Sequence, residues 1–192
     1  KLRSGNLRDQ EFNKLNEAAN ELAACKIFID DSANIKVSEV FSKCRKLRSE
    51  QGLDLIIIDY LQLISGSGKS NADSRQQEVS EISRSLKGLA REMECPVIAL
   101  SQLTRSVETR PDKHPMLSDL RESGAIEQDA DIVMFLYRED YYNKDKTEDD
   151  SSKDDVTDLD IAKHRNGATG RIQFVFRKHV SAFYNYASGY EN

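Results

Sequence analysis

The sequence has no tryptophan, only three prolines and three cysteines, and no apolar run long enough to cross a membrane. Cys25, Cys44 and Cys95 lie far apart without a C-x-x-C pair, which speaks against a zinc site or a disulfide framework. With neither a signal peptide nor a membrane span, we expect a cytoplasmic chain that binds no membrane. Its 192 residues, 38% of them hydrophobic, suit a single domain over 1–192.

The excess of negative charge belongs to one segment. Residues 139–160 hold ten acidic and three basic side chains, a net charge of −7, whereas the whole chain carries −5. The rest of the chain is therefore at +2, and a low isoelectric point does not exclude nucleic-acid binding. Because like charges repel and apolar residues are scarce there, we expect 139–158 to be a mobile acidic loop.

Hydrophobic periodicity predicts an α/β fold. Helical spacing of apolar residues predicts three helices, over 9–24, 37–50 and 76–94, the last with Val79, Ile82, Leu86, Leu89 and Met93 facing inward. Strands are predicted over 26–30, 53–59, 96–101 and 131–136, and then near 159–163, 171–177 and 181–186. The expected architecture is a layered sheet, mostly parallel with an antiparallel carboxyl-terminal edge, and incomplete at its amino terminus.

Two apolar runs, 55–59 and 96–102, each end in a polar group, Asp59 in the first and Gln102, after Ser101, in the second. All-apolar strands are typical of parallel sheets buried on both faces, and ligands bind outside the carboxyl ends of such strands. Asp59 and Gln102 would emerge there side by side. The carboxylate could hold a hydrated Mg²⁺ and the amide could contact a terminal phosphate. The alternative is two ordinary core strands that happen to end in a polar residue.

A short glycine-rich segment at 66–70, Gly-Ser-Gly-Lys-Ser, resembles the end of a phosphate-binding P-loop. A P-loop also requires a glycine five residues before its second one, and that position is Leu63. We therefore reject it in favour of a flexible glycine and serine loop. No other segment matches, so the chain has candidate metal and phosphate-sensing residues but no phosphate cradle.

Several further polar residues have two readings each. Lys163 and Arg165 lie two apart on a predicted strand and so share one face, either as a solvated basic strand end or as a phosphate-binding pair. Asp129 and Asp131 precede a strand, and we favour hydrogen bonds to the loop backbone over a metal pair.

The polar stretch before strand 131–136 contains Arg121, Glu122 and Gly124. Arginine offers forked donors to a phosphate and glycine allows close backbone approach, whereas the alternative is a helix cap with a surface salt bridge. Arg105 and Arg110, in the preceding loop, are weaker candidates for nucleic-acid contact.

Together with Asp59 and Gln102, the segments 53–63, 75–84, 120–138 and 161–170 closely resemble one family, the bacterial replicative DNA helicases of the DnaB type. The resemblance is to their carboxyl-terminal, RecA-like motor domain and covers nearly the whole chain. The family's amino-terminal domain, linker and Walker A region have no counterpart in this sequence, so we expect a truncated motor domain.

The resemblance implies a homohexamer around single-stranded DNA, with ATP and Mg²⁺ bound between neighbours and duplex DNA unwound at the fork. A primase and a helicase loader would be further partners. In this family Asp59 corresponds to the Walker B aspartate that orients Mg²⁺, and Gln102 to the glutamine that senses the γ-phosphate. Lys163 and Arg165 correspond to the pair that reaches the neighbouring subunit's γ-phosphate.

The same resemblance assigns Arg121, Glu122 and Gly124 to the loop that holds the DNA backbone in the ring channel. Tyr60 follows Asp59 where many ATPases have a catalytic glutamate. In this family that glutamate lies on an earlier strand, so the general base is expected to be absent as well. A non-catalytic RecA-fold binding or scaffold module is the alternative function, favoured by the missing P-loop.

We predict that the isolated chain does not hydrolyse ATP, because nothing in it holds the β- and γ-phosphates and Mg²⁺ is normally bound through the nucleotide as well. Phosphate release assays on the wild-type chain and on Asp59→Ala check this. Activity that disappears in Asp59→Ala would contradict the prediction and redirect attention to segment 66–70.

Overall fold

The computed structural model describes residues 5–66, 72–120, 124–142 and 155–186. The helices are α1 (Asp9–Ala24), α2 (Val37–Gln51), α3 (Ala72–Met93), α4 (Ser106–Thr109) and α5 (Gly124–Asp129). The strands are β1 (Ile56–Ile58), β2 (Val97–Ala99), β3 (Ile132–Tyr137), β4 (Asp155–His164), β5 (Gly170–Arg177) and β6 (Ala182–Asn185). None of the helices in these ranges combines the length and apolar content needed to span a membrane.

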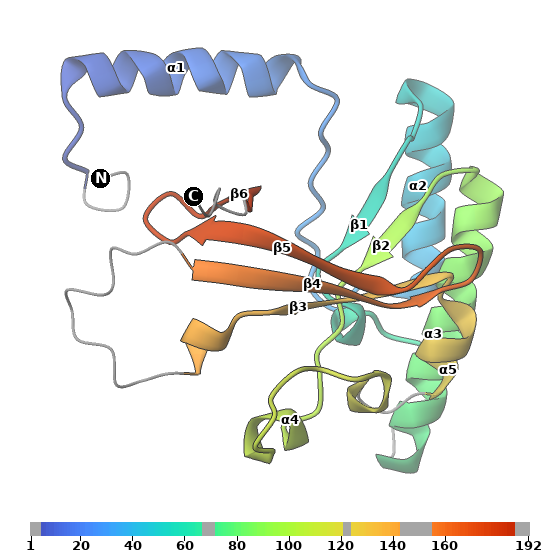
Figure 1. Cartoon of the computed structure of the whole chain (residues 1–192). Coiled ribbons are helices and arrows are strands. Elements are labelled where there is room, and N and C mark those ends of the chain that lie inside the picture. Colours follow the sequence, from blue (N-terminus) through green and yellow to red (C-terminus); the bar gives the residue numbers. More distant parts are fainter. Residues whose placement is uncertain (1–4, 67–71, 121–123, 143–154, 187–192) are drawn as a thin grey trace.

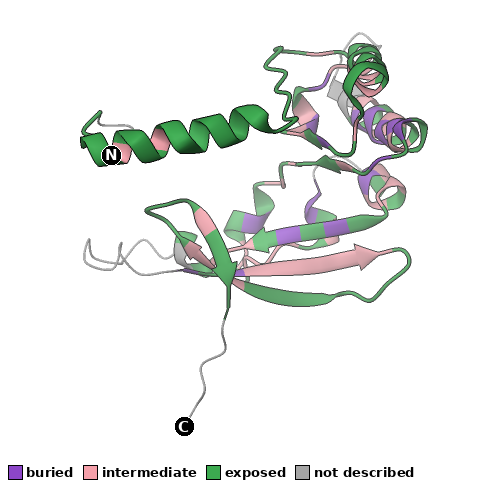
Figure 2. Cartoon of the chain, turned by 90° about the horizontal axis from the view of Figure 1, so that it is seen from above, coloured by how far each residue is buried: buried purple, intermediate pink, exposed green. Residues whose placement is uncertain are grey.

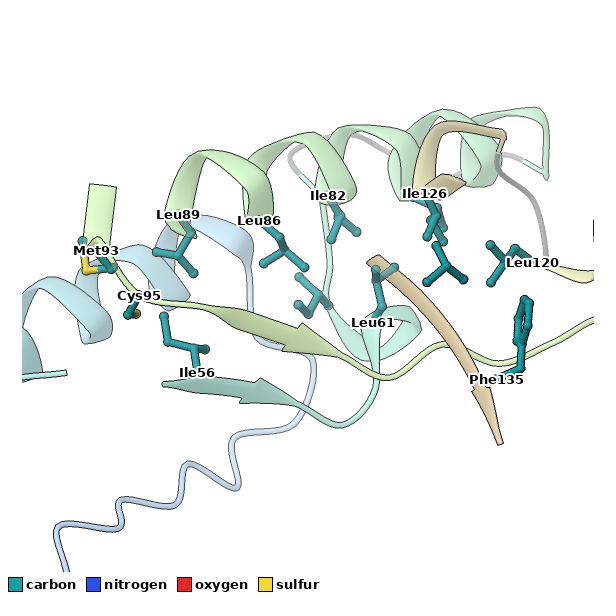
Figure 3. Packing of buried hydrophobic residues seen from close by; sticks show 13 residues of the cluster. Ile56, Leu61, Ile82, Leu86, Leu89, Met93, Cys95, Leu120, Ile126 and Phe135 are labelled. Atoms are coloured by element: carbon teal, nitrogen blue, oxygen red, sulfur yellow. The ribbon is translucent and has the colours of Figure 1, made fainter. Parts of the chain in front are cut away.

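Helix α3 provides the surface on which the core forms. Its inward residues follow helical spacing and are all buried, as the sequence predicts: Val79, Ile82, Leu86, Leu89 and Met93. Figure 3 shows this stripe facing residues from β1, the turn after it, α5 and β3. The partners labelled there are Ile56, Leu61, Cys95, Leu120, Ile126 and Phe135.

Strands β1 and β2 form a parallel pair, as expected, in which Ile58 lies opposite Ala99. Each strand is three residues long, shorter than its apolar run. The prediction that these strands are buried on both faces is wrong. Ile56 packs into the core, but Ile57 is 63% exposed and Ile98 is 42% exposed, because within the described residues helices cover only one face of the pair.

The remaining strands form an antiparallel sheet in the order β3-β4-β5-β6 (Figure 1). Strand β3 was expected among the parallel strands, but it is hydrogen-bonded to β4, with Phe135 opposite Asp160. Along β3, Val133 and Phe135 are buried while Met134 is exposed, so this strand also packs through alternate residues. Within the described residues, the antiparallel part of the fold is therefore larger than the parallel part.

The acidic loop begins and ends differently from the prediction over 139–158. Residues 155–158 belong to β4, and a short 3-10 turn covers Glu139–Tyr141. Asp155 is only 2% exposed and forms ion pairs with Arg138 at 3.4 Å and Lys178 at 2.8 Å. The positive charges of Arg138 and Lys178 offset the negative charge from which a mobile loop was predicted at 155–158. Residues 143–154 lie outside the described residues, so their mobility stays a prediction.

Helix α1 forms over the predicted residues, yet none of its side chains is buried (Figure 2). It stands away from both sheets in Figure 1. The strand predicted over 26–30 is absent. That segment is extended and exposed, and Ile29 is 89% exposed. A strand needs a hydrogen-bonding neighbour, and no described strand lies beside this segment.

We predict that Leu89→Ala lowers the free energy of unfolding by about 2–5 kcal/mol, since it removes a fully buried side chain and leaves a cavity. Urea titration of the isolated chain measures this. Leu22→Ala on α1, where the leucine is 61% exposed, is the matched control and should change stability by less than about 0.5 kcal/mol. Equal losses in the two variants would contradict the α3-centred core.

Candidate functional site

Asp59 and Gln102 emerge at the same edge of the parallel pair, as the sequence predicts. The N–H of Leu100 donates to the carbonyl of Ile58 at 2.9 Å, and the N–H of Leu61 donates to the carbonyl of Leu100 at 2.8 Å. These two bonds hold the backbone on both sides of Asp59 against the chain that leads to Gln102. Both side chains are exposed, so both are accessible to a ligand.

Gln62 joins these two chain segments and was missed by sequence reasoning. Its Oε1 accepts a hydrogen bond from the backbone N–H of Gln102 at 3.3 Å, and its Nε2 donates to Oγ of Ser101 at 3.0 Å. The available signal was a single amide between Leu61 and Leu63, three residues after Asp59. Gln62 therefore sets the path of the backbone from which the Gln102 side chain projects.

The surroundings of Asp59 fit a water-rich magnesium site. Within the described ranges, no three His, Cys, Asp or Glu side chains gather into a metal site of their own. Mg²⁺ commonly keeps several waters and takes one or two carboxylates together with substrate phosphates. An accessible carboxylate at the same edge of the strands as an accessible amide is compatible with that coordination.

Lys163, near the end of β4, binds the carboxyl-terminal carbonyls of α5. Its Nζ donates to the carbonyl oxygens of Glu127, of Gln128 at 3.4 Å and of Ala130 at 2.9 Å. A cation at this end of a helix is favoured by the helix dipole and supplies donors to carbonyls that have no partner within the helix. The reading of Lys163 as a solvated strand end is wrong.

Arg165, directly after β4, contacts the same end of α5. Its Nη2 donates to the carbonyl of Gln128 at 3.0 Å, and its Nη1 lies 3.2 Å from Oδ1 of Asp131. The backbone N–H of Arg165 also donates to the carbonyl of Asp131 at 2.8 Å. The predicted shared face of Lys163 and Arg165 is therefore confirmed, and the Arg165 side chain remains 45% exposed.

Asp131 forms ion pairs where hydrogen bonds to the loop backbone were expected. Its Oδ1 lies 2.5 Å from Nζ of Lys87 on α3, in addition to the contact with Arg165. The Lys87 hydrogen bond lowers the pKa of Asp131, with a smaller contribution from the charge of Arg165. The prediction of backbone hydrogen bonds for Asp131 is wrong because its partner Lys87 is 44 residues away in the sequence, and only the fold brings the two together. The carboxylate is fully ionised at neutral pH.

The candidate DNA loop is only partly visible. Arg121 and Glu122 lie outside the described residues, so their roles stay predictions. Gly124 is exposed and begins α5, and a Cβ added to it would meet no atom within 4 Å. No steric constraint in the described structure therefore explains the glycine.

Comparison with known proteins decides the family. A family model described as the DnaB-like helicase C terminal domain matches residues 1–185. The chain belongs to this family. It is 58% identical over 184 residues to the replicative DNA helicase DnaB of Geobacillus stearothermophilus, and 55% identical over 184 residues to the replicative DNA helicase DnaC of Bacillus subtilis. Each match covers 96% of this chain but 39% of the relative.

Two solved structures resemble the fold closely. One is described as an ATPase domain and matches with a TM-score of 0.84 and 43% identity, over 96% of this chain and 63% of that one. A DnaB-like replicative helicase, described with its interactions with primase, matches with a TM-score of 0.81 and 43% identity, over 95% of this chain and 43% of that one. The expected fold class, a layered α/β sheet of the RecA-like ATPase type, is confirmed.

Arg110 has a structural role, which corrects its assignment as a weaker DNA contact. Its guanidinium binds both carboxylate oxygens of Asp119, at 3.0 and 2.7 Å, and donates to the carbonyl of His114 at 2.8 Å. Asp119 is 3% exposed and also accepts the N–H of Met116 at 2.8 Å. Arg110 therefore holds the loop between β2 and α5 together. Arg105 is exposed and keeps its status as a candidate.

A pocket at the carboxyl end of β3 was also missed. It has a volume of about 210 Å³ and is lined by Leu136, Tyr137, Arg138, Tyr141, Tyr142, Thr157 and Phe183. The guanidinium of Arg138 lies 4.9 Å from the ring centre of Phe176 and 5.6 Å from that of Tyr141. These contacts hold the Arg138 guanidinium against aromatic rings of its own chain. The sequence signal was the pair of tyrosines soon after Tyr137 and Arg138.

We predict that Lys163→Met lowers the free energy of unfolding of the isolated chain by about 1–2 kcal/mol, because the carbonyls of Glu127 and Gln128 in α5, and of Ala130 just after it, lose a charged donor. Urea titration provides the measurement. Lys46→Met, at a lysine 75% exposed whose Nζ lies 4.0 Å from Glu50, is the control and should change stability by less than about 0.5 kcal/mol. Indistinguishable variants would mean that Lys163 does not stabilise α5.

Proposed function

We propose that this chain is part of an ATP-dependent hexameric replicative helicase that moves along single-stranded DNA and unwinds duplex DNA at the fork. Membership of the DnaB-like family over residues 1–185 is the observation that carries the proposal. The accessible Asp59 and Gln102 at one edge of the parallel strands support it independently. Ligands of open α/β sheets commonly bind at such edges.

In this proposal ATP with Mg²⁺ supplies the phosphoryl group that is transferred to water. Asp59 helps to hold Mg²⁺, in part through its bound waters, and Gln102 contacts the terminal phosphate. Gln62 would hold Gln102 in place for this contact, because it binds the backbone N–H of Gln102 and Oγ of Ser101. Residues 103–120 connect Gln102 to the proposed DNA loop, so a movement of Gln102 could be passed on to that loop.

Lys163 and Arg165 are proposed to act on the ATP bound by a neighbouring subunit. A guanidinium near the γ-phosphate offsets the charge that develops on the transferred group, which elsewhere raises the rate by roughly 10³–10⁵-fold. The exposure of Arg165 supports this role, since an arginine buried within its own chain could not reach another one. The subunits would form a homohexamer with one such pair at each interface.

Arg121, Glu122 and Gly124 are proposed to line the channel and hold the DNA backbone, with Arg121 binding phosphate and Glu122 orienting it. Primase and a helicase loader are proposed partners, and the cytoplasm is the proposed location. The solved helicase described with its primase interactions supports the first partner by similarity.

A non-catalytic RecA-fold scaffold remains the second candidate, because the chain has no P-loop motif. The two functions differ in a simple measurement. The helicase proposal requires that Asp59 and Arg165 be needed for ATP turnover in a complete subunit, whereas a scaffold has no use for either. We therefore define the chimeric helicase as the Geobacillus stearothermophilus relative in which this chain replaces the matching segment.

In the chimeric helicase, Arg165→Ala should abolish DNA unwinding and lower DNA-stimulated ATP turnover by roughly 10³-fold or more, while nucleotide affinity changes little. The reason is that the guanidinium acts on charge present only in the transition state. Steady-state hydrolysis, a strand-separation assay and fluorescent nucleotide binding measure the three quantities. Turnover that survives the substitution would sink the proposed role.

Mixed hexamers test the action in trans. An Arg165→Ala subunit keeps its own Asp59, so it should regain hydrolysis when a neighbour carrying Asp59→Ala supplies an intact Arg165. Turnover in the mixture should exceed that of either parent variant. Mixtures that never recover would show that Arg165 acts within its own subunit or only holds β4 in place.

A further inference from the structure

The loop between α5 and β3 brings together charged groups from three elements. Asp131 belongs to this loop, Lys87 comes from the middle of α3, and Arg165 follows β4. Figure 1 shows α5 lying against α3, with β3 and β4 leading away from them. Asp131 thus links Arg165, which directly follows β4, to Lys87 on α3, the helix at the centre of the core.

The contacts hold Arg165 from one side. Nη1 faces Oδ1 of Asp131 at 3.2 Å, and Nη2 donates to the carbonyl of Gln128 at 3.0 Å. A guanidinium has five N–H donors in a planar fork, and of these two contacts the one to Gln128 is a hydrogen bond and the one to Asp131 is an ion pair. The backbone bond from the N–H of Arg165 to the carbonyl of Asp131, at 2.8 Å, fixes the start of the side chain as well.

Asp131 is itself held by a rigid partner. Lys87 is 20% exposed and lies between Leu86 and the fully buried Leu89 on α3, so its position follows from core packing. Its Nζ lies 2.5 Å from Oδ1 of Asp131, the oxygen that also faces Arg165. The Lys87 hydrogen bond lowers the pKa of Asp131 and keeps the carboxylate charged.

A purely stabilising ion pair does not explain this arrangement well. The Asp131 side chain is 57% exposed and that of Arg165 is 45% exposed, and ion pairs this accessible contribute little to stability. Their geometric effect is larger, because the ion pair with Asp131 and the hydrogen bond to the Gln128 carbonyl together restrict where the other N–H groups of the arginine point.

We propose that Asp131 is a positioning residue that orients the Arg165 guanidinium toward the phosphates in a neighbouring subunit. The inference rests on the proposed trans role of Arg165. Asp131 contacts neither nucleotide nor metal in this proposal and acts only through Arg165. Lys87 keeps the carboxylate in place from α3.

The test is Asp131→Asn in the chimeric helicase, which keeps the shape of the side chain and removes its charge. We expect kcat of DNA-stimulated ATP hydrolysis to fall roughly 10- to 100-fold, with KM for ATP within about twofold, since a misplaced group loses transition-state contacts. Asp131→Glu should retain more turnover than Asp131→Asn because it restores the charge. Equal losses in both variants would contradict the proposal.

The matched control is Asp160→Asn. Asp160, on β4, also faces an arginine at 2.5 Å, Arg171, but lies away from Arg165. It should leave kcat within about twofold of the unsubstituted chimera, because its ion-pair partner is Arg171 and not Arg165. A loss equal to that of Asp131→Asn would show that the effect is not specific to Arg165.

Mixed hexamers separate positioning from a structural defect. An Asp131→Asn subunit should regain hydrolysis at its own site when an Asp59→Ala neighbour supplies an intact Asp131 and Arg165. No recovery, in mixtures where Arg165→Ala does recover, would overturn the positioning role alone. If Arg165→Ala also fails to recover, the proposed trans role itself is wrong, so the two failures are distinguishable.

Discussion

Burial of the apolar stripe along α3 is the interaction on which the other described elements depend. Val79, Ile82 and Leu89 are fully buried, and β1, β3 and α5 each bring residues to them. Burying a large aliphatic side chain contributes roughly 1.5–3 kcal/mol, so a stripe of five such residues outweighs any ion pair on the surface. Because the strands reach α3 through alternate residues only, each presents its other face to solvent in this chain.

The candidate site depends on the same packing although its residues are exposed. Asp59 lies one residue after β1, whose Ile56 is in the core, and Asp131 lies one residue before β3, whose Val133 and Phe135 are buried. Lys87 belongs to α3 itself. Polar groups at the ends of such elements have their backbones fixed by core contacts, whereas their side chains remain open to a ligand or to another subunit.

Local periodicity made the helices and the shared face of Lys163 and Arg165 predictable from sequence, because side-chain direction follows from spacing alone. Which strands would pair with each other was not predictable in the same way. Segment 26–30 is apolar enough for a strand but has no described neighbour, and 155–158 forms a strand because β5 lies beside it. The ion pair of Arg110 with Asp119 was not predictable for a related reason, since nothing in the sequence distinguishes this buried aspartate from the exposed ones.

The contacts at the end of α5 also distinguish Lys163 from Arg165, which the sequence pattern alone does not separate. Lys163 has three N–H donors and three carbonyl oxygens within reach of them, so in this conformation its ammonium group is fully used within its own chain. Arg165 donates a side-chain hydrogen bond to Gln128, forms an ion pair with Asp131 and is nearly half exposed. To reach a neighbour's phosphate, Lys163 would have to leave α5, whereas Arg165 could add a phosphate while keeping Asp131. In this conformation Lys163 therefore stabilises the end of α5, and of the two residues proposed to act on a neighbour's ATP, Arg165 is the one that could do so without leaving its present contacts.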